Sequence, residues 1–277
     1  MNHLIQNFGI STRRSCKIAQ IARSTFLYEK KPNDDHIILE TIKKIISRYN
    51  KYGCEMIHLK LRQKGILINH KRTARIYREN GLQLKARKRR RKIASEERVP
   101  VDLPAEPLKL WAMDFINDSV GSSRKLKVLT VIDPVTNKSP IVYPAYSITG
   151  NHLSEILEEA CETHGYPKII QCDNGPEFRG QEFDRWCFNH GIKISYSRPG
   201  KPVDNCHVES FNGTFRNECL NSNYFENLKS AKKIIEDWRV EYNEERPQKR
   251  LKGMTPSQYE DKLLRQKTNP MSGRIVG

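Results

Sequence analysis

Residues 171–178 read QCDNGPEF, and the Asn174-Gly175 pair within them has two structural explanations. An Asn-Gly pair between two strands commonly forms a two-residue hairpin turn. Alternatively, a buried strand ends at Asp173 and presents this carboxylate at the carboxyl edge of a sheet, with Gly175 allowing close approach of a ligand. The residues that follow have the i, i+3, i+4, i+7 spacing of a helix: Phe183, Trp186, Cys187 and His190. Because no second strand follows, the sequence favours the strand end.

The segments around this stretch alternate between strand and helix patterns. Three β-rich segments precede it and suggest an antiparallel meander: residues 108–118, 124–133 and 138–147. We expect two further strands, at 167–173 and 192–197. Helical patterns cover residues 151–164, about 180–190, 204–221 and 226–244. This order predicts a mixed α/β layer fold.

The charge of the chain is concentrated in its first part. The sequence has 49 Lys and Arg against 32 Asp and Glu, a net charge of +17. Residues 1–100 hold 25 of the basic and 8 of the acidic residues, so they carry the whole excess. A charge of this size indicates a polyanionic partner, nucleic acid before membrane.

The composition excludes several other classes of protein. No apolar run is long enough to span a membrane, and the polar start MNHLIQNFGI is unlike a signal peptide. The seven cysteines include no CxxC pair, which argues against a zinc knuckle or a thioredoxin-like motif. We therefore expect a cytoplasmic, nucleoid-associated protein with reduced cysteines.

The basic part contains helical patterns before the first strand. Residues 11–29 give a weak helix-turn-helix signal, and residues 36–50, 55–65 and 69–81 predict three further helices. In the last of these, Lys71, Arg72 and Arg75 line the side opposite the apolar positions. This arrangement predicts a basic helical module with a recognition helix for DNA.

A run of cations, KARKRRRK, follows at residues 85–92. It has no apolar period, and its charges would repel one another in a compact state. Such a run can be merely solvated, but its place between two modules favours contact with phosphates. The candidate DNA-binding residues are Lys85, Arg87, Lys88, Arg89, Arg90, Arg91 and Lys92.

Three acidic residues lie on the elements predicted to form the α/β layer: Asp114, Asp173 and Glu209. Each has an ordinary explanation, as a polar residue of a strand, an Asx turn and a solvated helix residue respectively. Asp114, however, lies in the apolar stretch LWAMDFI, where an uncompensated carboxylate is costly. Three clustered carboxylates would stay ionised next to divalent cations, and oxygen ligands suit two Mg²⁺ or Mn²⁺ ions. Two such ions can support in-line phosphoryl transfer.

The spacing of these acids, with the motifs around them, identifies a family. Asp173 lies 59 positions after Asp114, and 35 residues separate it from Glu209. With WAMDFI (111–116), CDNGPEF (172–178) and two later blocks, PGKPVDNCHVESFNGTFRNECLN (199–221) and YNEERPQKRLKGMTPSQY (242–259), the chain resembles the OrfB transposases of the insertion-sequence family numbered three. Those proteins share the D,D,35,E catalytic core of retroviral integrases.

The resemblance implies an RNase H-like core in which Asp114, Asp173 and Glu209 are the catalytic, metal-binding triad. It also implies that Arg216 contacts the DNA end, and that Asp133 is not a member of the triad. The loop SRPGKPVDN (197–205), with Lys201, is either a mobile connector or a segment that closes over DNA. Gln248 and residues 54–56 depart from the family pattern, which puts details of DNA contacts in doubt.

These features give a domain organisation and a set of partners. We expect a helix-turn-helix segment (1–33), a second helical module (34–84), a basic linker (85–106), the catalytic core (107–262) and a tail (263–277). The implied partners are terminal inverted repeats, target DNA and further copies of the chain. An upstream-frame protein is a further implied partner, as a fusion or separately, since this chain shows no sustained heptad pattern and resembles the downstream product alone.

Three alternatives remain from the sequence. A catalytically inactive DNA-binding regulator would use the core as a scaffold, although none of the three acids has been lost. A structure-selective nuclease of the same fold would not need two helical modules that read sequence. A Tyr or Ser recombinase would form a covalent link to DNA.

Overall fold

A computed structural model describes residues 2–28, 34–84, 106–197 and 206–268. It divides into two compact units, Met1–Lys43 and Lys44–Gly277, each of which is considered by itself. The candidate DNA-binding residues Lys85, Arg87, Lys88, Arg89, Arg90, Arg91, Lys92 and Lys201 lie outside the described residues, as does most of the loop before Glu209.

The first unit contains short helices with a break between the second and the third. They are α1 (Asn2–Phe8), α2 (Thr12–Ile18) and α3 (Arg23–Phe26). The Ser11 side chain accepts a hydrogen bond from the Arg14 amide at 3.4 Å and so caps α2. The helices of residues 11–29 are therefore confirmed, and their role in reading DNA stays a prediction.

Helix α4 (Asp35–Arg48) crosses from the first unit into the second, and α5 (Cys54–Gln63) and α6 (His70–Glu79) follow it. The Asn69 side chain accepts a hydrogen bond from the Lys71 amide at 2.9 Å, which caps α6 as its sequence predicts. Thr73, Ile76 and Tyr77 are buried on one side of α6, while Lys71 and Arg75 are exposed on the other. The helix therefore presents a basic face.

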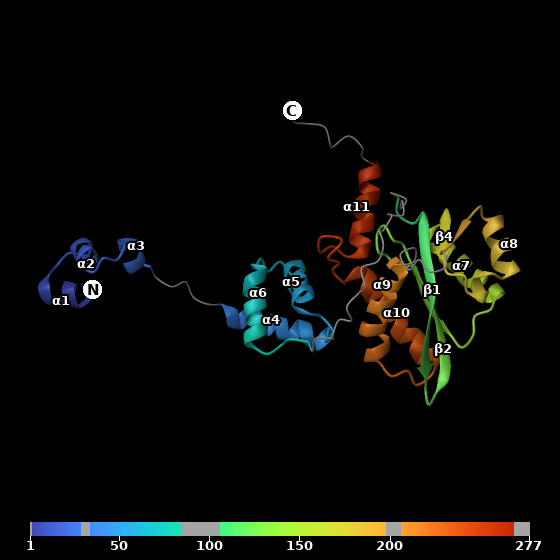
Figure 1. Ribbon diagram of the computed structural model, residues 1–277, viewed down its shortest axis with the longest axis horizontal. Helices are drawn as coiled ribbons and strands as arrows, with labels where there is room; N and C mark the ends of the chain where they lie inside the picture. The colour runs from blue at the N-terminus through green and yellow to red at the C-terminus, as the bar shows by residue number, and fades with distance from the viewer. Residues whose placement is uncertain (1, 29–33, 85–105, 198–205, 269–277) are drawn as a thin grey trace. The chain divides into compact units, whose positions relative to one another are not determined.

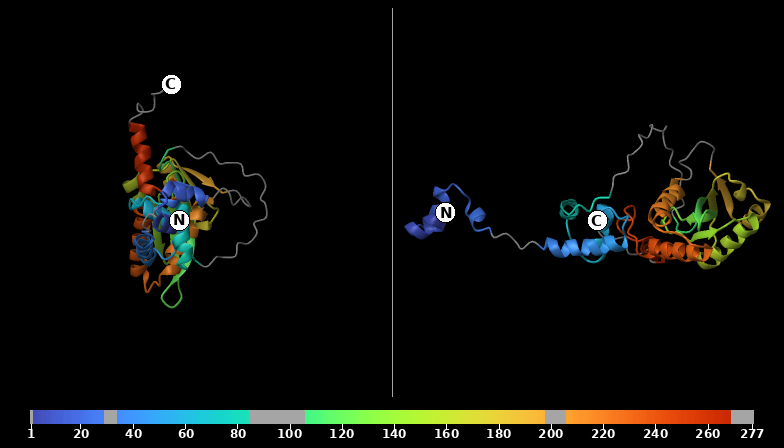
Figure 2. Two further views of the ribbon diagram at one scale, coloured as in Figure 1. Left: turned by 90° about the vertical axis from the view of Figure 1, so that its left-hand side faces the viewer. Right: turned by 90° about the horizontal axis from the view of Figure 1, so that it is seen from below.

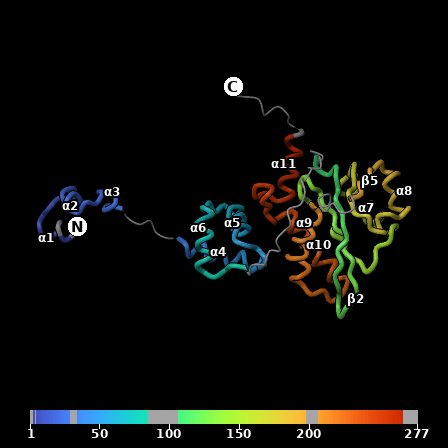
Figure 3. The backbone as a smooth tube through the Cα atoms, in the orientation of Figure 1, coloured from blue at the N-terminus to red at the C-terminus, as the bar shows by residue number. Residues whose placement is uncertain are grey.

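The core is built on a five-stranded mixed sheet in the order β3-β2-β1-β4-β5. Its strands are β1 (Leu110–Val120), β2 (Arg124–Ile132), β3 (Ile141–Ala145), β4 (Ile169–Cys172) and β5 (Lys193–Tyr196). The first three form the expected antiparallel meander, and Figure 3 follows the chain from β1 into β2 through the turn at the end of the hairpin. β4 runs parallel to β1, and β5 runs parallel to β4. This is the sheet of an RNase H-like fold.

Helices cover both faces of the sheet. One face packs against α7 (Gly150–His164) and α8 (Gln181–Asn189), with Trp111 and Met113 in the shared core. The other packs against α9 (Cys206–Glu218) and α10 (Leu228–Glu244), with Ala112 and Ile116 in that core. Figures 1 and 2 show the sheet between these helix pairs. Alternate residues of β1 therefore face different helices, as the two-residue period of a strand requires.

Helix α11 (Pro256–Thr268) and the short 3-10 helices η1 (Pro176–Phe178) and η3 (Leu220–Ser222) complete the fold. α11 crosses the expected boundary between the core and the tail at residue 262. Among the described residues, the longest apolar helical stretches fall short of what a bilayer crossing requires.

Asp133, a second acid at a strand end, forms hydrogen bonds with nearby backbone and side-chain groups. Its carboxylate is fully buried and accepts hydrogen bonds from the amides of Leu108 at 3.0 Å and Val135 at 2.8 Å, and from the Thr136 hydroxyl at 2.7 Å. Burial raises the pKa of Asp133, while these hydrogen bonds lower it. The side chain therefore holds together the turn after β2.

We expect Asp133→Ala to lower the free energy of unfolding by about 2 kcal/mol, because it leaves buried donors without an acceptor. Urea denaturation of the two proteins measures this change. A change below about 0.5 kcal/mol would show that these hydrogen bonds do not stabilise the turn after β2.

Candidate active site

Asp114 and Asp173 come from adjacent parallel strands whose register brings them to the same level. The paired residues are Leu110 with Ile169, Trp111 with Ile170, and Ala112 with Gln171, a constant offset of 59 positions. The same offset separates Asp114 from Asp173, which follows the last residue of β4. The hairpin alternative is thereby excluded: β4 ends, η1 follows and α8 begins. Asp173 lies at the carboxyl end of its strand.

Glu209 lies in the first turn of α9, on a helix face next to its buried stripe. Val208, Phe211 and Phe215 are buried against the sheet, as their spacing predicts, while Glu209 is exposed. Asp114 has the same parity along β1 as Ala112 and Ile116, which pack in this core. The Asp114 carboxylate therefore faces the α9 side of the sheet.

The charges of Asp173 and Glu209 act on the Asp114 carboxylate. Asp114 is half-buried, and burial is the largest cause of its raised pKa. The hydrogen bond from the Phe115 amide lowers this pKa, the charge of Asp173 raises it, the Asn212 amide lowers it, and the charge of Glu209 raises it again. The site therefore disfavours a third negative charge unless a cation is bound.

Asn212 connects α9 directly to Asp114. Its Nδ2 donates to Asp114 Oδ2 at 2.8 Å, and its Oδ1 accepts from the Thr130 hydroxyl at 2.8 Å. Thr130, fully buried on β2, lies opposite Asp114 in the antiparallel register. The sequence places Asn212, three positions after Glu209, on the same helix face but assigns it no role, and it does not single out Thr130. That spacing is the signal that could have found it.

The turn after Asp173 is shaped around its carboxylate. Asp173 Oδ1 accepts a hydrogen bond from the Gly175 amide at 2.9 Å, an Asx turn. A Cβ at Gly175 would lie 2.9 Å from that same oxygen and 3.2 Å from Glu177 Oε2. With φ of −59°, the position needs glycine for space and not for its backbone angle. Gly175 thus leaves room for the Asp173 carboxylate itself.

Glu177 faces β2. Its carboxylate forms an ion pair with Lys127, whose ammonium also lies 4.2 Å from the centre of the Phe115 ring. That ring stacks on Phe178 with centroids 4.9 Å apart. Lys127 is a residue that the sequence did not single out, and its partner is separated from it by 50 positions. The contacts hold η1 against the sheet beside Asp173.

Arg216 lies on the exposed side of α9 and donates to the backbone oxygen of Asn117 at 3.2 Å. Among the described residues, no three His, Cys, Asp or Glu side chains are close enough to hold a metal ion as they stand. The residue types still fit a hard divalent cation, because all three acids offer oxygen ligands and Asp114 is destabilised by its acidic neighbours. The DNA-binding and metal-binding roles remain predictions.

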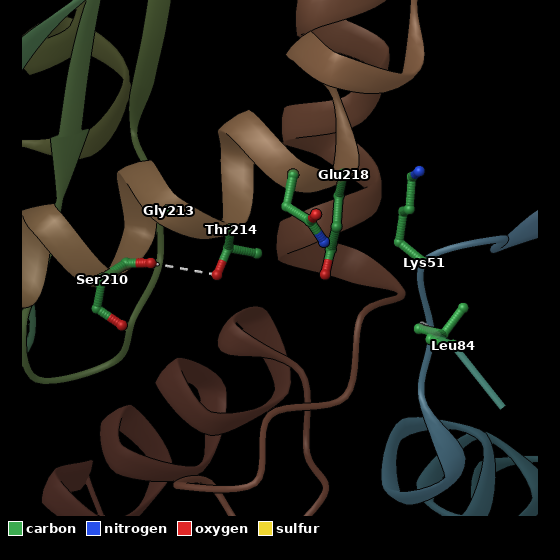
Figure 4. Close-up of a pocket in the computed structure, with 7 residues that line it drawn as sticks. Lys51, Leu84, Ser210, Gly213, Thr214 and Glu218 are labelled. Carbon is green, nitrogen blue, oxygen red and sulfur yellow. Dashed lines mark hydrogen bonds between the residues drawn. The ribbon is translucent and has the colours of Figure 1, made fainter. Parts of the chain in front are cut away.

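A cavity of about 550 Å³ lies beside the exposed face of α9 (Figure 4). Its lining on α9 begins at Ser210, next to Glu209, and continues along the helix. The opposite side is formed by Lys51 and Leu84. The lining residues are Lys51, Leu84, Ser210, Gly213, Thr214, Asn217 and Glu218. A cavity with polar and apolar lining therefore extends along the helix that carries Glu209.

Comparison with known proteins agrees with this architecture. Integrase core domain models match residues 104–202 and 190–256, and an HTH-like domain model matches residues 32–90. A chain of the simian T-cell lymphotropic virus intasome, in complex with PP2A regulatory subunit B56 gamma, has a similar fold. Its TM-score is 0.53 with 16% sequence identity, over 85% of this chain and 76% of that chain. The class of protein is thus one in which a helix-turn-helix-like domain precedes an integrase core.

Two bacterial relatives define the family. A 31.7 kDa protein of insertion element IS407 from Burkholderia multivorans is 34% identical over 94% of this chain and 94% of its own length. The putative transposase InsK for insertion sequence element IS150 from Escherichia coli is 31% identical over 88% of this chain and 91% of its own length. The chain belongs to the OrfB-type transposases of bacterial insertion sequences.

Proposed function

We propose that Asp114, Asp173 and Glu209 form the catalytic centre for DNA strand cleavage and strand transfer. The observation that carries this proposal is the register of β1 and β4, which brings the two aspartates together beside the helix that bears Glu209. The raised pKa of Asp114, to which the other two acids contribute, supports their proximity.

The three carboxylates are the residues that would hold Mg²⁺ or Mn²⁺, and two ions fit the reaction class. When bound, such ions lower the charge of the attacked phosphate and favour ionisation of the attacking oxygen. They would also keep Asp114 ionised despite its burial.

The reaction has two displacements at phosphorus. In the first, a water oxygen attacks the phosphodiester at the element end, the bond from phosphorus to the 3′ oxygen breaks, and a 3′-OH is released. In the second, this 3′-OH attacks a target phosphodiester, forming one P–O bond while another breaks to free a target 3′-OH. Asn212 orients Asp114 during both steps, and Gly175 and Lys127 keep the Asp173 turn in place. No covalent protein intermediate is needed.

The remaining parts of the chain supply the DNA contacts. The basic face of α6, with Lys71, Arg72 and Arg75, is proposed to hold the terminal inverted repeats, and Arg216 the strand end. Two ends and a target require more than one copy of the chain on DNA. The nucleoid as its place of action and a partnership with the upstream-frame protein are parts of the same proposal.

The test uses the full-length chain, a labelled duplex bearing the element's terminal repeat, an unlabelled target duplex and Mg²⁺. We expect a nick at the element end, joining of the new 3′-OH to the target, and loss of both products on chelation by EDTA. Binding without cleavage would indicate a regulator, and cleavage without joining a nuclease. A trapped covalent adduct would indicate a Tyr or Ser recombinase.

We expect Asn212→Ala to lower cleavage by about 10- to 100-fold, since it removes the donor that orients Asp114. Thr130→Val should give a smaller loss, because Asn212 would keep its bond to Asp114 while losing its own partner. The rate of cleavage at saturating DNA measures both effects, and a higher Mg²⁺ requirement should accompany them. Asn189→Ala, at the exposed end of α8, is the matched control. Equal rates for Asn212→Ala and this control would exclude a positioning role.

A further inference from the structure

The end of α10 is joined to the helical region before the core by a cluster of charged and aromatic contacts. Glu245, the residue that ends α10, accepts from Arg48 Nη2 at 2.9 Å through Oε1 and from the Tyr49 hydroxyl at 2.7 Å through Oε2. Its backbone oxygen accepts from Lys60 Nζ at 2.7 Å. A carbonyl at a helix C-terminus has no donor within the helix, and the ammonium of α5 satisfies it.

The Lys60 and Tyr49 contacts are shielded from water, whereas the Arg48–Glu245 pair is exposed. Lys60 is 8% exposed, and burial lowers its pKa. Tyr49 and Tyr52 are also buried, and their rings stack with centroids 4.6 Å apart. A lysine this buried is costly without partners, so the Glu245 contacts are a requirement for this packing.

We call the set Arg48, Tyr49, Lys60 and Glu245 the clamp. It continues on one side toward the basic helix: Lys60 lies on α5, and on the same helix His58 Nδ1 is 3.1 Å from the Thr73 hydroxyl of α6. α6 carries the exposed residues Lys71 and Arg75.

On the other side the clamp continues toward the catalytic helix. Arg246, the residue after Glu245, pairs with Glu218 of α9 at 2.7 and 2.9 Å. Tyr242 of α10 also contacts Phe211 of α9, with ring centroids 5.0 Å apart. A continuous series of contacts therefore runs from the buried side of α6, behind its basic face, to the helix that bears Glu209. Along this path, Lys51 is held across the cavity from α9 (Figure 4).

We infer that the clamp sets the position of the cut. It holds α6 at one fixed distance from the carboxylates, so the phosphodiester that reaches them is determined by where the repeat is bound. Glu245, Tyr49 and Lys60 are positioning residues in this scheme, because none of them is among the proposed catalytic or DNA-contacting groups. The inference rests on the proposed function.

The test maps every cut at single-nucleotide resolution on an end-labelled duplex that carries the terminal repeat. Glu245→Ala removes the acceptor for Arg48 and Tyr49 and should spread the cuts from one phosphodiester to its neighbours. Binding of the duplex should stay within about threefold, below 1 kcal/mol, since the basic face of α6 is unchanged. Glu236→Gln is the control, because Glu236 lies on α10 and pairs with Arg239 within that helix.

A second measurement does not depend on activity. Amide hydrogen exchange of residues 54–63 in the full-length protein should become about tenfold faster in Lys60→Met, since this variant removes the ammonium that binds the Glu245 backbone oxygen and joins α5 to the end of α10. Exchange in β1 should not change. If Glu245→Ala does not fold, Tyr49→Phe replaces it, with a smaller spread of cuts and a smaller change in exchange.

The outcomes separate this inference from the proposed function. A wild-type protein that binds the repeat and never cuts it would overturn the proposed function. Cleavage by the wild type, with a clamp variant that cuts the same single phosphodiester at the same yield, would overturn the positioning role alone. Unchanged exchange of residues 54–63 would show that the clamp does not hold α5.

Discussion

Glu209→Gln is expected to lower strand cleavage by at least about a thousandfold, the largest effect of any substitution considered for this chain. Glutamine keeps the length and shape of the side chain and removes only its charge. Glu209 is exposed on α9 and its charge raises the pKa of Asp114, so the site should fold normally without it. Binding of divalent cations between the three acids should be the property that is lost.

The measurement is the single-turnover rate of nicking on a labelled repeat duplex, together with the affinity for that duplex. We expect the affinity to stay within about threefold, because Glu209 is not among the proposed DNA contacts. Glu162 is an exposed residue of α7, as Glu209 is of α9. Glu162→Gln removes the same charge at this control position and should leave the rate unchanged. Nicking by Glu209→Gln at the wild-type rate would remove Glu209 from the catalytic site.

The position of the two aspartates could be predicted from the sequence because it depends on short-range patterns. A strand that ends at Asp173 and a helix that follows it are both encoded by local periodicity. The interval between Asp114 and Asp173 equals the register offset of β1 and β4. The spacing in the sequence therefore corresponds to neighbouring positions on the two strands. The exposed face of α9 followed in the same way from its buried stripe.

The partners of these acids could not be predicted, because they depend on the packing of distant segments. Thr130 is placed opposite Asp114 by the β1–β2 register, and Lys127 meets Glu177 across 50 positions. The place of Asn212 beside Glu209 on the helix gave no indication that its amide reaches Asp114, 98 positions away. The local sequence does not indicate which strands lie next to each other in the sheet.

The block YNEERPQKR (242–250) was matched only as a family motif, and the structure gives it a part in packing. Glu245 joins the end of α10 to α5, and Arg246 joins it to α9. The motif alone does not show which of its charged residues join helices, since a run of charged residues is equally compatible with a solvated surface. Burial, which only the folded chain defines, makes these charges structural.

Arg246→Met is expected to lower the free energy of unfolding by about 3 to 5 kcal/mol, because it leaves Glu218 without its partner in a nearly buried position. The two side chains are 12% and 13% exposed and form two hydrogen bonds, at 2.7 and 2.9 Å. The Arg246 guanidinium also lies 5.6 Å from the centre of the Tyr242 ring and 6.0 Å from that of Tyr52. Removing the cation therefore costs both an ion pair and contacts with two aromatic rings.

Urea denaturation, followed by tryptophan fluorescence, measures this loss. Lys249→Met is the matched control: Lys249 pairs with Glu55 at 2.8 Å, but the two side chains are 76% and 61% exposed, so its loss should cost less than about 1 kcal/mol. The double variant Glu218→Leu/Arg246→Met should recover much of the lost stability, since it removes the buried charge together with its partner. Equal destabilisation by the double variant and by Arg246→Met would mean that the aromatic contacts of Arg246, and not its pairing with Glu218, stabilise this end of α10.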